Sequence, residues 1–336
     1  MLKPDLYDSN DKMPIFKQIA QSIAKQIDKG LLKKDFRLPS INGFSNEYAV
    51  ARDTVERAYR ELKKQGYITS VFGKGYYVVG KKESKIKILL VFNKLSSFKK
   101  IIYYSFLKTL GDRAVVELQI HHYKALQLKK IIESNIGKYD YYVIMPHFET
   151  NANKKTYTKI IKKIPPGELL LLDKSIPELT GIMSVYQDFR TDIFDALVSA
   201  SELLKKYDRL TIIFPELSNH PPEIIEGLEQ FCKNYGKKFN IIRDGEKIKL
   251  VKGAVYLVIA DDDLAILIKK VRKSDYAMGK EIGIISFNET ELKELLDITV
   301  ISTDFVKMGQ TAASLILKKQ IRQVRNPFKI IRRSSL

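Results

Sequence analysis

The sequence has few of the residues on which enzymes and cross-linked proteins depend. Its 336 residues include one cysteine, Cys232, which can form no internal disulfide and has no second thiol for a zinc site. It contains four histidines and no nucleophile-elbow or phosphate-loop motif, so catalysis has little support. We therefore expect a protein that is not an enzyme and that holds no cofactor and no metal ion.

Long apolar segments are also lacking. No run approaches the roughly 18 residues that would cross a bilayer. Residues 1–12 are polar and carry three aspartates where a signal peptide would have an apolar core. We expect a cytoplasmic protein with no membrane partner.

Positive charge is in excess. The chain has 58 Lys and Arg against 39 Asp and Glu, a net charge of +19, which is compatible with an anionic partner but does not establish one. Residues 1–80 contain 14 basic and 9 acidic residues, a surplus of five, so charge does not single out this segment. The length predicts two or three domains.

The first 80 residues combine three helical patterns with a hairpin. Apolar residues at helical spacing span 14–30, with a proline in the first turn and a glycine at the end. After Pro39, Ser40 can cap a second helix that runs to about Tyr48. A turn at 49–51 leads to a third helix that stops at Gly66, so the second and third helices form a helix-turn-helix candidate.

Residues 67–79 alternate as two strands around the tight turn Gly73-Lys74-Gly75. At the start of the third helix, Arg52 could bind a guanine through two hydrogen bonds, and Thr54 could hold a phosphate. The turn would bring the cation of Lys74 close to a duplex. The alternative is that Arg52 is a solvated surface residue and the hairpin turn has no role in binding.

In order and spacing, these features resemble the winged helix-turn-helix of the GntR family. The resemblance covers residues 13–79 and is carried by the segments 14–19, 37–40, 51–55, 62–68 and 73–78. It implies DNA contacts by Arg52, Thr54, Gly73 and Lys74, and it places Arg37 and Ser40 in a motif that packs against or touches the phosphate backbone.

Three positions depart from the family. Many members carry arginine where Asn42 and Glu56 stand here, and a capping serine or threonine where Ala51 stands. Glu56 could accept a hydrogen bond from a cytosine amine but would repel phosphates. The operator sequence therefore stays open.

Beyond a polar linker at 81–86, short apolar runs alternate with amphipathic helices, which predicts an α/β domain of parallel sheets flanked by helices. The expected strands are 86–92, 114–121, 141–145, 169–172, 209–214, 239–242, 254–259 and 282–285. The expected helices are 97–110, 124–135, 154–163, 189–206, 221–235 and 262–273. So many strands favour two similar lobes. We therefore expect a DNA-binding domain at 1–80 and a two-lobed domain at 87–336.

The second domain resembles the sugar-binding half of the LacI/GalR repressors, itself similar to periplasmic sugar-binding proteins. The segments that carry the resemblance are 87–92, 170–174, 185–188, 259–265, 282–289, 299–303, 308–313 and 331–335. In open α/β folds ligands sit beyond the carboxyl ends of the strands, and sugars need amides, carboxylates and an aromatic face. We expect effector contacts from Asn93, Phe98, His147, Asp188, Asp262 and Asn288, with Phe92 as an alternative aromatic platform.

Some of these polar residues have structural alternatives. Asp173 and Asp261 could cap helices, and His147 could bond only to loop backbone. LacI-like domains usually place a sugar-binding arginine where Ile224 stands here. Either the ligand has a different pose in this chain, or His220 or Asn219 substitutes for the arginine.

Together these patterns predict a repressor of a carbohydrate-utilisation operon. It would act as a homodimer on operator DNA, controlled by a monosaccharide or sugar phosphate; release and assisted binding both remain open. An aminotransferase-like fusion would need a Schiff-base lysine segment and a longer chain. A transport binding protein is disfavoured by the winged helix and the polar start of the chain.

Overall fold

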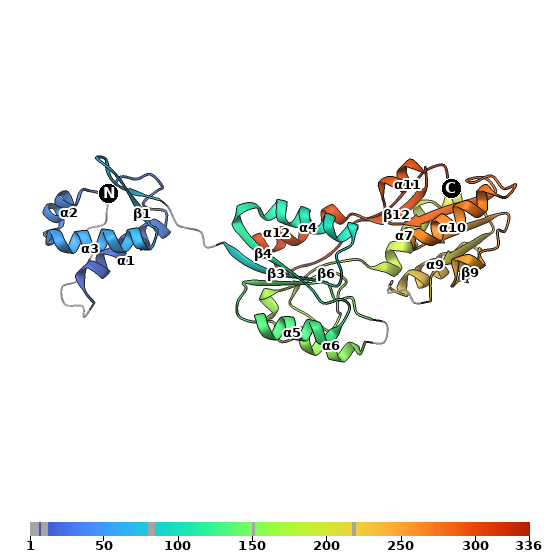
Figure 1. Cartoon of the computed structure of the whole chain (residues 1–336), viewed down its shortest axis with the longest axis horizontal. Coiled ribbons are helices and arrows are strands. Elements are labelled where there is room, and N and C mark those ends of the chain that lie inside the picture. Colours follow the sequence, from blue (N-terminus) through green and yellow to red (C-terminus); the bar gives the residue numbers. More distant parts are fainter. Residues whose placement is uncertain (1–6, 8–12, 80–84, 150–151, 217–219) are drawn as a thin grey trace. The chain divides into compact units, whose positions relative to one another are not determined.

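The structure is a computed structural model that describes residues 7, 13–79, 85–149, 152–216 and 220–336. Two compact units divide the chain, Met1–Ser84 and Lys85–Leu336 (Figure 1). Of the linker expected at 81–86, residues 81–84 lie outside the described residues, as does most of segment 1–12. Ile86 is already the first residue of a strand.

The smaller unit is a winged helix-turn-helix, as predicted. Its elements are α1 (Ile15–Asp28), α2 (Ile41–Tyr48), α3 (Arg52–Lys64), β1 (Ile68–Val71) and β2 (Gly75–Val78). The apolar residues of each helix lie three or four positions apart and meet in one core that includes Ile23, Phe44 and Tyr59, none of them exposed. The hydroxyl of Tyr59 donates to the carbonyl of Pro39 over 2.9 Å and thereby ties α3 to the segment before α2.

The larger unit contains two six-stranded sheets that confirm the predicted two-lobed α/β fold. The N-terminal lobe has the strand order β13-β7-β6-β5-β3-β4 and the C-terminal lobe the order β14-β12-β11-β10-β8-β9. All neighbours are parallel except β14, which runs antiparallel to β12. Both lobes use residues from distant parts of the chain.

The N-terminal lobe is built from β3 (Ile86–Phe92), α4 (Ser97–Leu110), β4 (Ala114–Ile120), α5 (Ala125–Asn135), β5 (Tyr141–Ile144), α6 (Lys154–Ile161), β6 (Leu169–Asp173), β7 (Met183–Tyr186), α12 (Phe305–Leu317) and β13 (Gln323–Arg325). The C-terminal lobe is built from α7 (Phe189–Ser199), α8 (Ser201–Leu204), β8 (Arg209–Ile213), α9 (Glu223–Asn234), β9 (Lys238–Ile242), β10 (Ala254–Val258), α10 (Asp261–Arg272), β11 (Ile282–Phe287), α11 (Glu291–Leu295), β12 (Thr299–Thr303) and β14 (Phe328–Ile331).

Helices cover both faces of each sheet. In the N-terminal lobe, α4 and α12 lie on one face and α5 and α6 on the other (Figure 1). Helix α12 packs so closely on α4 that a Cβ added at Gly309 would lie 2.5 Å from the carbonyl oxygen of Ile102. In the C-terminal lobe, α7 and α9 cover one face and α10 the other.

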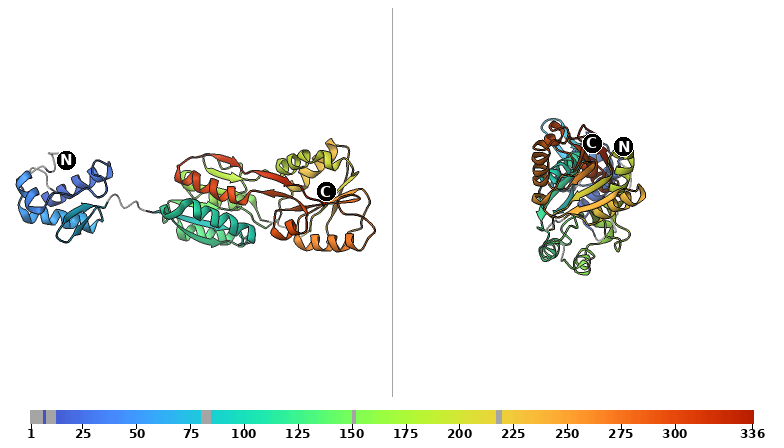
Figure 2. Two further views of the ribbon diagram at one scale, coloured as in Figure 1. Left: turned by 90° about the horizontal axis from the view of Figure 1, so that it is seen from above. Right: turned by 90° about the vertical axis from the view of Figure 1, so that its right-hand side faces the viewer.

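The chain passes between the lobes three times, after β7, after β12 and after β13, so C-terminal segments appear in both lobes (red in Figure 2). Buried Asn326 joins the three passages. Its backbone N–H donates to the carbonyl of Tyr186 (2.7 Å), and its side-chain amide donates to the hydroxyl of Thr303 (2.8 Å). Next to it, Arg325 forms an ion pair with Asp192 of α7 at 2.7 Å. This cluster ties together the segments that connect the two lobes.

Candidate DNA-binding surface and effector cleft

The first turn of α3 exposes a cation. Arg52 forms no ion pair with any residue that the structure describes, whereas Arg57 pairs with Asp53 (2.9 Å) and Arg60 with Glu56 (3.1 Å). These exposed pairs contribute little to stability. They do reduce the repulsion that Glu56 alone would exert on a phosphate. Arg52 is therefore the side chain of this turn that is available to a duplex.

The remaining expected DNA contacts lie around α2, α3 and the hairpin. Ser40 caps α2 by accepting a hydrogen bond from the N–H of Gly43 (3.0 Å), and Thr54 is half-buried beside Arg52 in α3. Arg37 lies against the hairpin, where a Cβ on Gly75 would be 3.5 Å from its Nε. Lys74 is exposed at the tip with Gly73, whose φ of 70° needs the conformational freedom of glycine. The structure thus brings Arg37, from the segment before α2, beside the hairpin.

A cleft of about 460 Å³ opens where the loops that follow the parallel strands of the two lobes meet. Part of its wall is aromatic, because Phe98 stacks on Phe305 with ring centroids 5.0 Å apart, and Tyr123, Phe189 and Phe287 also line it. Four expected contacts line the cleft: Asn93, Phe98, His147 and Asn288.

Asp173, at the end of β6, organises the floor of the cleft. One carboxylate oxygen lies 3.1 Å from Lys99 Nζ and 2.9 Å from His147 Nε2, and the other accepts a hydrogen bond of 2.5 Å from the amide of Gln187. Burial alone would raise the pKa of Asp173, but the charge of Lys99 and the hydrogen bond from His147 outweigh it and hold the pKa far below its usual range. Asp173 is therefore a carboxylate, and not the helix cap that the sequence left open.

The negative charge of Asp173 orients the side chains of His147 and Gln187, because both donate a hydrogen bond to it. Burial lowers the pKa of His147, so the ring is neutral and donates through Nε2, which leaves Nδ1 as an acceptor. The amide nitrogen of Gln187 faces the carboxylate, and its carbonyl oxygen is buried with no partner among the described residues. The buried amide oxygens of Asn93 and Asn288 likewise have no partner in the part of the chain that the structure describes. The cleft is therefore rich in acceptors that lack donors.

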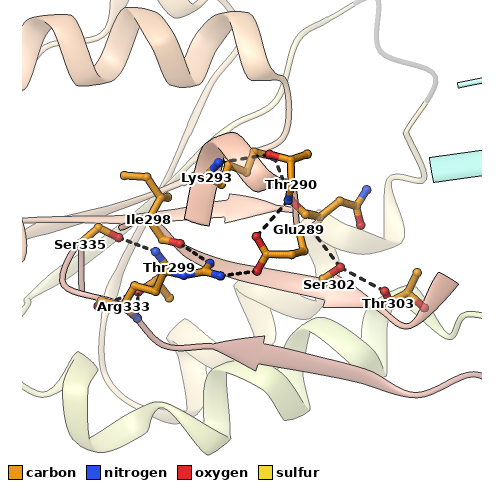
Figure 3. A network of polar contacts seen from close by, with 10 residues as sticks. Glu289, Thr290, Lys293, Ile298, Thr299, Ser302, Thr303, Arg333 and Ser335 are labelled. Atoms are coloured by element: carbon orange, nitrogen blue, oxygen red, sulfur yellow. Dashed lines mark hydrogen bonds and ion pairs between the residues drawn. The ribbon is translucent and has the colours of Figure 1, made fainter. Parts of the chain in front are cut away.

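Contacts within the C-terminal lobe fix the position of the loop that carries Asn288. Buried Lys293 donates to the carbonyls of Phe287 (2.8 Å) and Asn288 (2.9 Å) and pairs with Asp261 of the cleft at 2.8 Å. Glu289, the residue after Asn288, contacts both β12 and the tail (Figure 3): its N–H donates to the hydroxyl of Ser302 over 3.1 Å, and its carboxylate pairs with Arg333 at 2.8 Å. The loop that carries Asn288 is thereby fixed to α11 and to the C-terminal tail.

Two expected contacts do not line the cleft. Asp188 caps α7, accepting hydrogen bonds from the N–H and hydroxyl of Thr191, while its neighbours Gln187 and Phe189 line the cleft. Asp262 is exposed on α10, and Asp261 lines the cleft instead. The alternative prediction, that Phe92 is the aromatic platform for a sugar, is wrong, because the ring of Phe92 is fully buried in the core of the N-terminal lobe.

The position at which LacI-like domains usually carry a sugar-binding arginine holds a core residue here. Ile224 is fully buried in the core of the C-terminal lobe and does not face the cleft. His220 does line the cleft, and burial lowers its pKa to about 4, so it is neutral. Asn219, the other suggested replacement, lies outside the described residues.

Sequence reasoning missed Lys99 and Gln187. Lys99 lies inside a correctly predicted helix, where a lysine is ordinarily assigned to the solvent. A run of four leucines that ends in an aspartate, 169–173, was the one available indication that a charge is placed at the edge of the sheet.

Two further expectations concern metals and membranes. Within the described residues, no group of His, Cys, Asp and Glu is arranged to hold a metal ion. In the same part of the chain, no helix is both long and apolar enough to cross a membrane.

Comparison with known proteins identifies the first domain. Residues 15–78 match the family "Bacterial regulatory proteins, gntR family". The transcriptional repressor YtrA of Bacillus subtilis is 26% identical over 126 residues, which are 38% of this chain and 85% of YtrA. The mannosyl-D-glycerate transport/metabolism system repressor MngR of Escherichia coli is 40% identical over 65 residues, 19% of this chain but only 27% of MngR.

Solved structures match the second domain. The transcriptional repressor ascG of Escherichia coli has a TM-score of 0.62 at 15% identity, with 75% of this chain and 99% of that chain covered. A LacI family transcriptional regulator of Enterococcus faecalis with bound ribose has a TM-score of 0.57 at 18% identity, with 74% and 98% covered. At this identity the match establishes the fold of the domain.

The family matched by the first domain is one of bacterial regulatory proteins. Residues 15–78 therefore form a helix-turn-helix of the gntR type, and the second domain has the fold of the LacI family regulator to which it is similar.

Proposed function

We propose that the protein represses a carbohydrate-utilisation operon in the cytoplasm and that a sugar bound in the cleft changes its affinity for operator DNA. The exposed Arg52 and the cationic hairpin supply the DNA contacts, with Ser40 and Thr54 beside the phosphates. A homodimer would place two α3 helices on half-sites about one helical turn apart. The exposed leucines of α11, Leu292 (70%) and Leu295 (81%), support self-association.

The acceptor-rich floor of the cleft carries the effector assignment. The amides of Gln187, Asn93 and Asn288 line the cleft, and a small movement of these side chains would let sugar hydroxyls donate to their buried oxygens, which have no donor among the described residues. The stacked pair of Phe98 and Phe305 offers an apolar face to the C–H side of a sugar ring.

Between a free sugar and its phosphate ester, the floor favours the free sugar. Esterification replaces one hydroxyl donor of the sugar by a phosphate dianion, which has no hydrogen to donate to these acceptors. The charge of Lys99 is already matched by Asp173, and Lys94 is exposed. The pairing leaves little unbalanced positive charge at the floor for an anion.

Thermal shift with matched pairs tests this assignment: pentoses, hexoses and disaccharides, each beside its phosphate ester, with inorganic phosphate as a control for general anion effects. A specific free sugar should raise the melting temperature by mass action and should also shift operator affinity in fluorescence anisotropy. A sugar that stabilises the protein without changing DNA affinity would contradict the regulatory role, and stabilisation by phosphate esters alone would contradict the ligand class.

A further inference from the structure

The tip of the hairpin carries an aromatic ring that the fold does not use. Phe72, between β1 and Lys74, is 103% exposed, whereas the next most exposed large apolar side chain in the described part of the smaller unit is Leu31 at 57%. The core of this unit does not include Phe72. Folding therefore gains nothing from a phenyl ring at this position, and a ring in water invites a partner.

The tip holds the ring in a defined place. The N–H of Lys74 donates to the carbonyl of Val71 (3.0 Å) and closes a four-residue turn with Gly73 at φ 70°. The hydroxyl of Tyr77 donates to the carbonyl of Lys74 over 3.2 Å and braces the turn from the second strand. Phe72 is thus presented at the end of a hydrogen-bonded hairpin.

The surroundings of the ring are cationic. Lys74 is two residues away, Arg37 lies against the hairpin, and Lys63 of α3 donates to the hydroxyl of Ser70 on β1 over 2.7 Å. No Asp or Glu occurs between positions 62 and 79. A partner must therefore combine negative charge with an apolar surface that a flat ring can enter. The minor groove of DNA offers both: phosphates along its edges, and sugars and base steps within.

We propose that Phe72 enters the minor groove beside the major-groove site of α3 and wedges against a base step, which bends the operator. The proposal rests on the DNA-binding role of this domain. Arg37, Lys63 and Lys74 hold the flanking phosphates, and the ring adds a preference for a base step that unstacks easily. Sequence preference would then extend beyond the bases that Arg52 can reach.

The experiment uses the full chain and an operator that it selects from random duplexes. Binding is measured by fluorescence anisotropy, and bending by energy transfer between dyes at the two duplex ends. Phe72→Ala should weaken binding to the selected operator roughly 5- to 150-fold, the loss typical of one base-stacking aromatic, and should straighten the duplex. Phe72→Leu should retain most of both, because apolar wedges need not be aromatic.

Two controls separate the ring from the charges and from folding. Leu31→Ala removes another exposed apolar side chain of the same unit and should leave binding and bending unchanged. Lys74→Ala should weaken binding to all sequences and reduce the salt dependence, while the bend of bound DNA remains.

The outcomes are distinct. If Phe72→Ala binds and bends the operator as the parent does, the wedge is refuted. The wedge is also refuted if Phe72→Ala leaves DNA binding unchanged but weakens binding of the chain to vesicles of anionic phospholipid. If the parent chain selects no sequence at all, it is the DNA-binding function of the chain that fails.

Discussion

Replacing Asp173 by asparagine should destabilise the larger unit, and a second substitution should repair it. Asp173 and Lys99 have side chains only 8% and 11% exposed, at 3.1 Å from each other. Asp173→Asn leaves the ammonium of Lys99 buried without a countercharge, which costs about 3–5 kcal/mol. For a domain of this size that corresponds to a fall in melting temperature of about 6–20 °C, measured by calorimetry on the full chain.

The double variant Asp173→Asn, Lys99→Met removes both charges. Since an apolar replacement of a buried pair is often neutral, most of the lost stability should return. Sugar binding should not return, because His147 and Gln187 are no longer oriented by a carboxylate. Equal melting temperatures for the single and double variants would refute the claim that an uncompensated charge causes the loss. Recovery of sugar affinity in the double variant would refute the role of Asp173 in orienting the acceptors.

Three further predictions follow from particular contacts. Arg52→Ala should weaken binding to the selected operator by about 1–3 kcal/mol and binding to random DNA much less; equal losses in anisotropy would mean that Arg52 holds only phosphate. Burial, opposed by Arg325, raises the pKa of Asp192 to about 6, so the folded state holds a proton that the unfolded state releases near pH 4. The contribution of this group to the free energy of unfolding is therefore complete below pH 4 and is lost as the pH rises through 6. It amounts to at most about 3 kcal/mol. Urea unfolding at several pH values should show this pH dependence in the parent chain and not in Asp192→Asn. Gly309→Ala should cost about 1–3 kcal/mol because its methyl group would meet the backbone of α4, whereas Gly167→Ala, with nothing within 4 Å, should leave the melting temperature unchanged.

The sequence predicted those helices and strands whose local hydrophobic pattern matches their burial in the folded protein. Strand 86–92 and helix 97–110 match the structure to the residue, because one is an apolar run interrupted only by Lys87 and the other is amphipathic with Ser96 as its cap. The helix predicted at 189–206 is instead two helices, α7 and α8, which are separated at Ala200. The local sequence gives no reason for this interruption. Strand β7, strands β12 to β14 and helices α11 and α12 were not predicted; the strands are only three to five residues long, too short for periodicity to be distinctive.

The candidate site was predictable at the level of strand ends but not of contacts. Asn93 and Asn288 follow directly after β3 and β11, and position alone suffices to place them at the cleft. The pair of Lys99 and Asp173 joins residues 74 positions apart and cannot be inferred from spacing. Asp188 and Gln187 are adjacent, and the cap required by α7 decides which of them is free for the cleft.

The interleaving of the two lobes bears on how the protein is made. The sheet of the N-terminal lobe is completed by β13, and one of its faces is covered by α12, yet about 120 residues of the C-terminal lobe lie in the chain between these segments and β7. During synthesis the first lobe would therefore wait, with the apolar side chains of β3, β6 and β7 uncovered, until residue 325 has emerged from the ribosome. The winged helix-turn-helix, whose described core residues all lie between positions 7 and 78, has no such delay, so a nascent chain would hold a finished DNA-binding domain well before it holds a domain that can sense an effector.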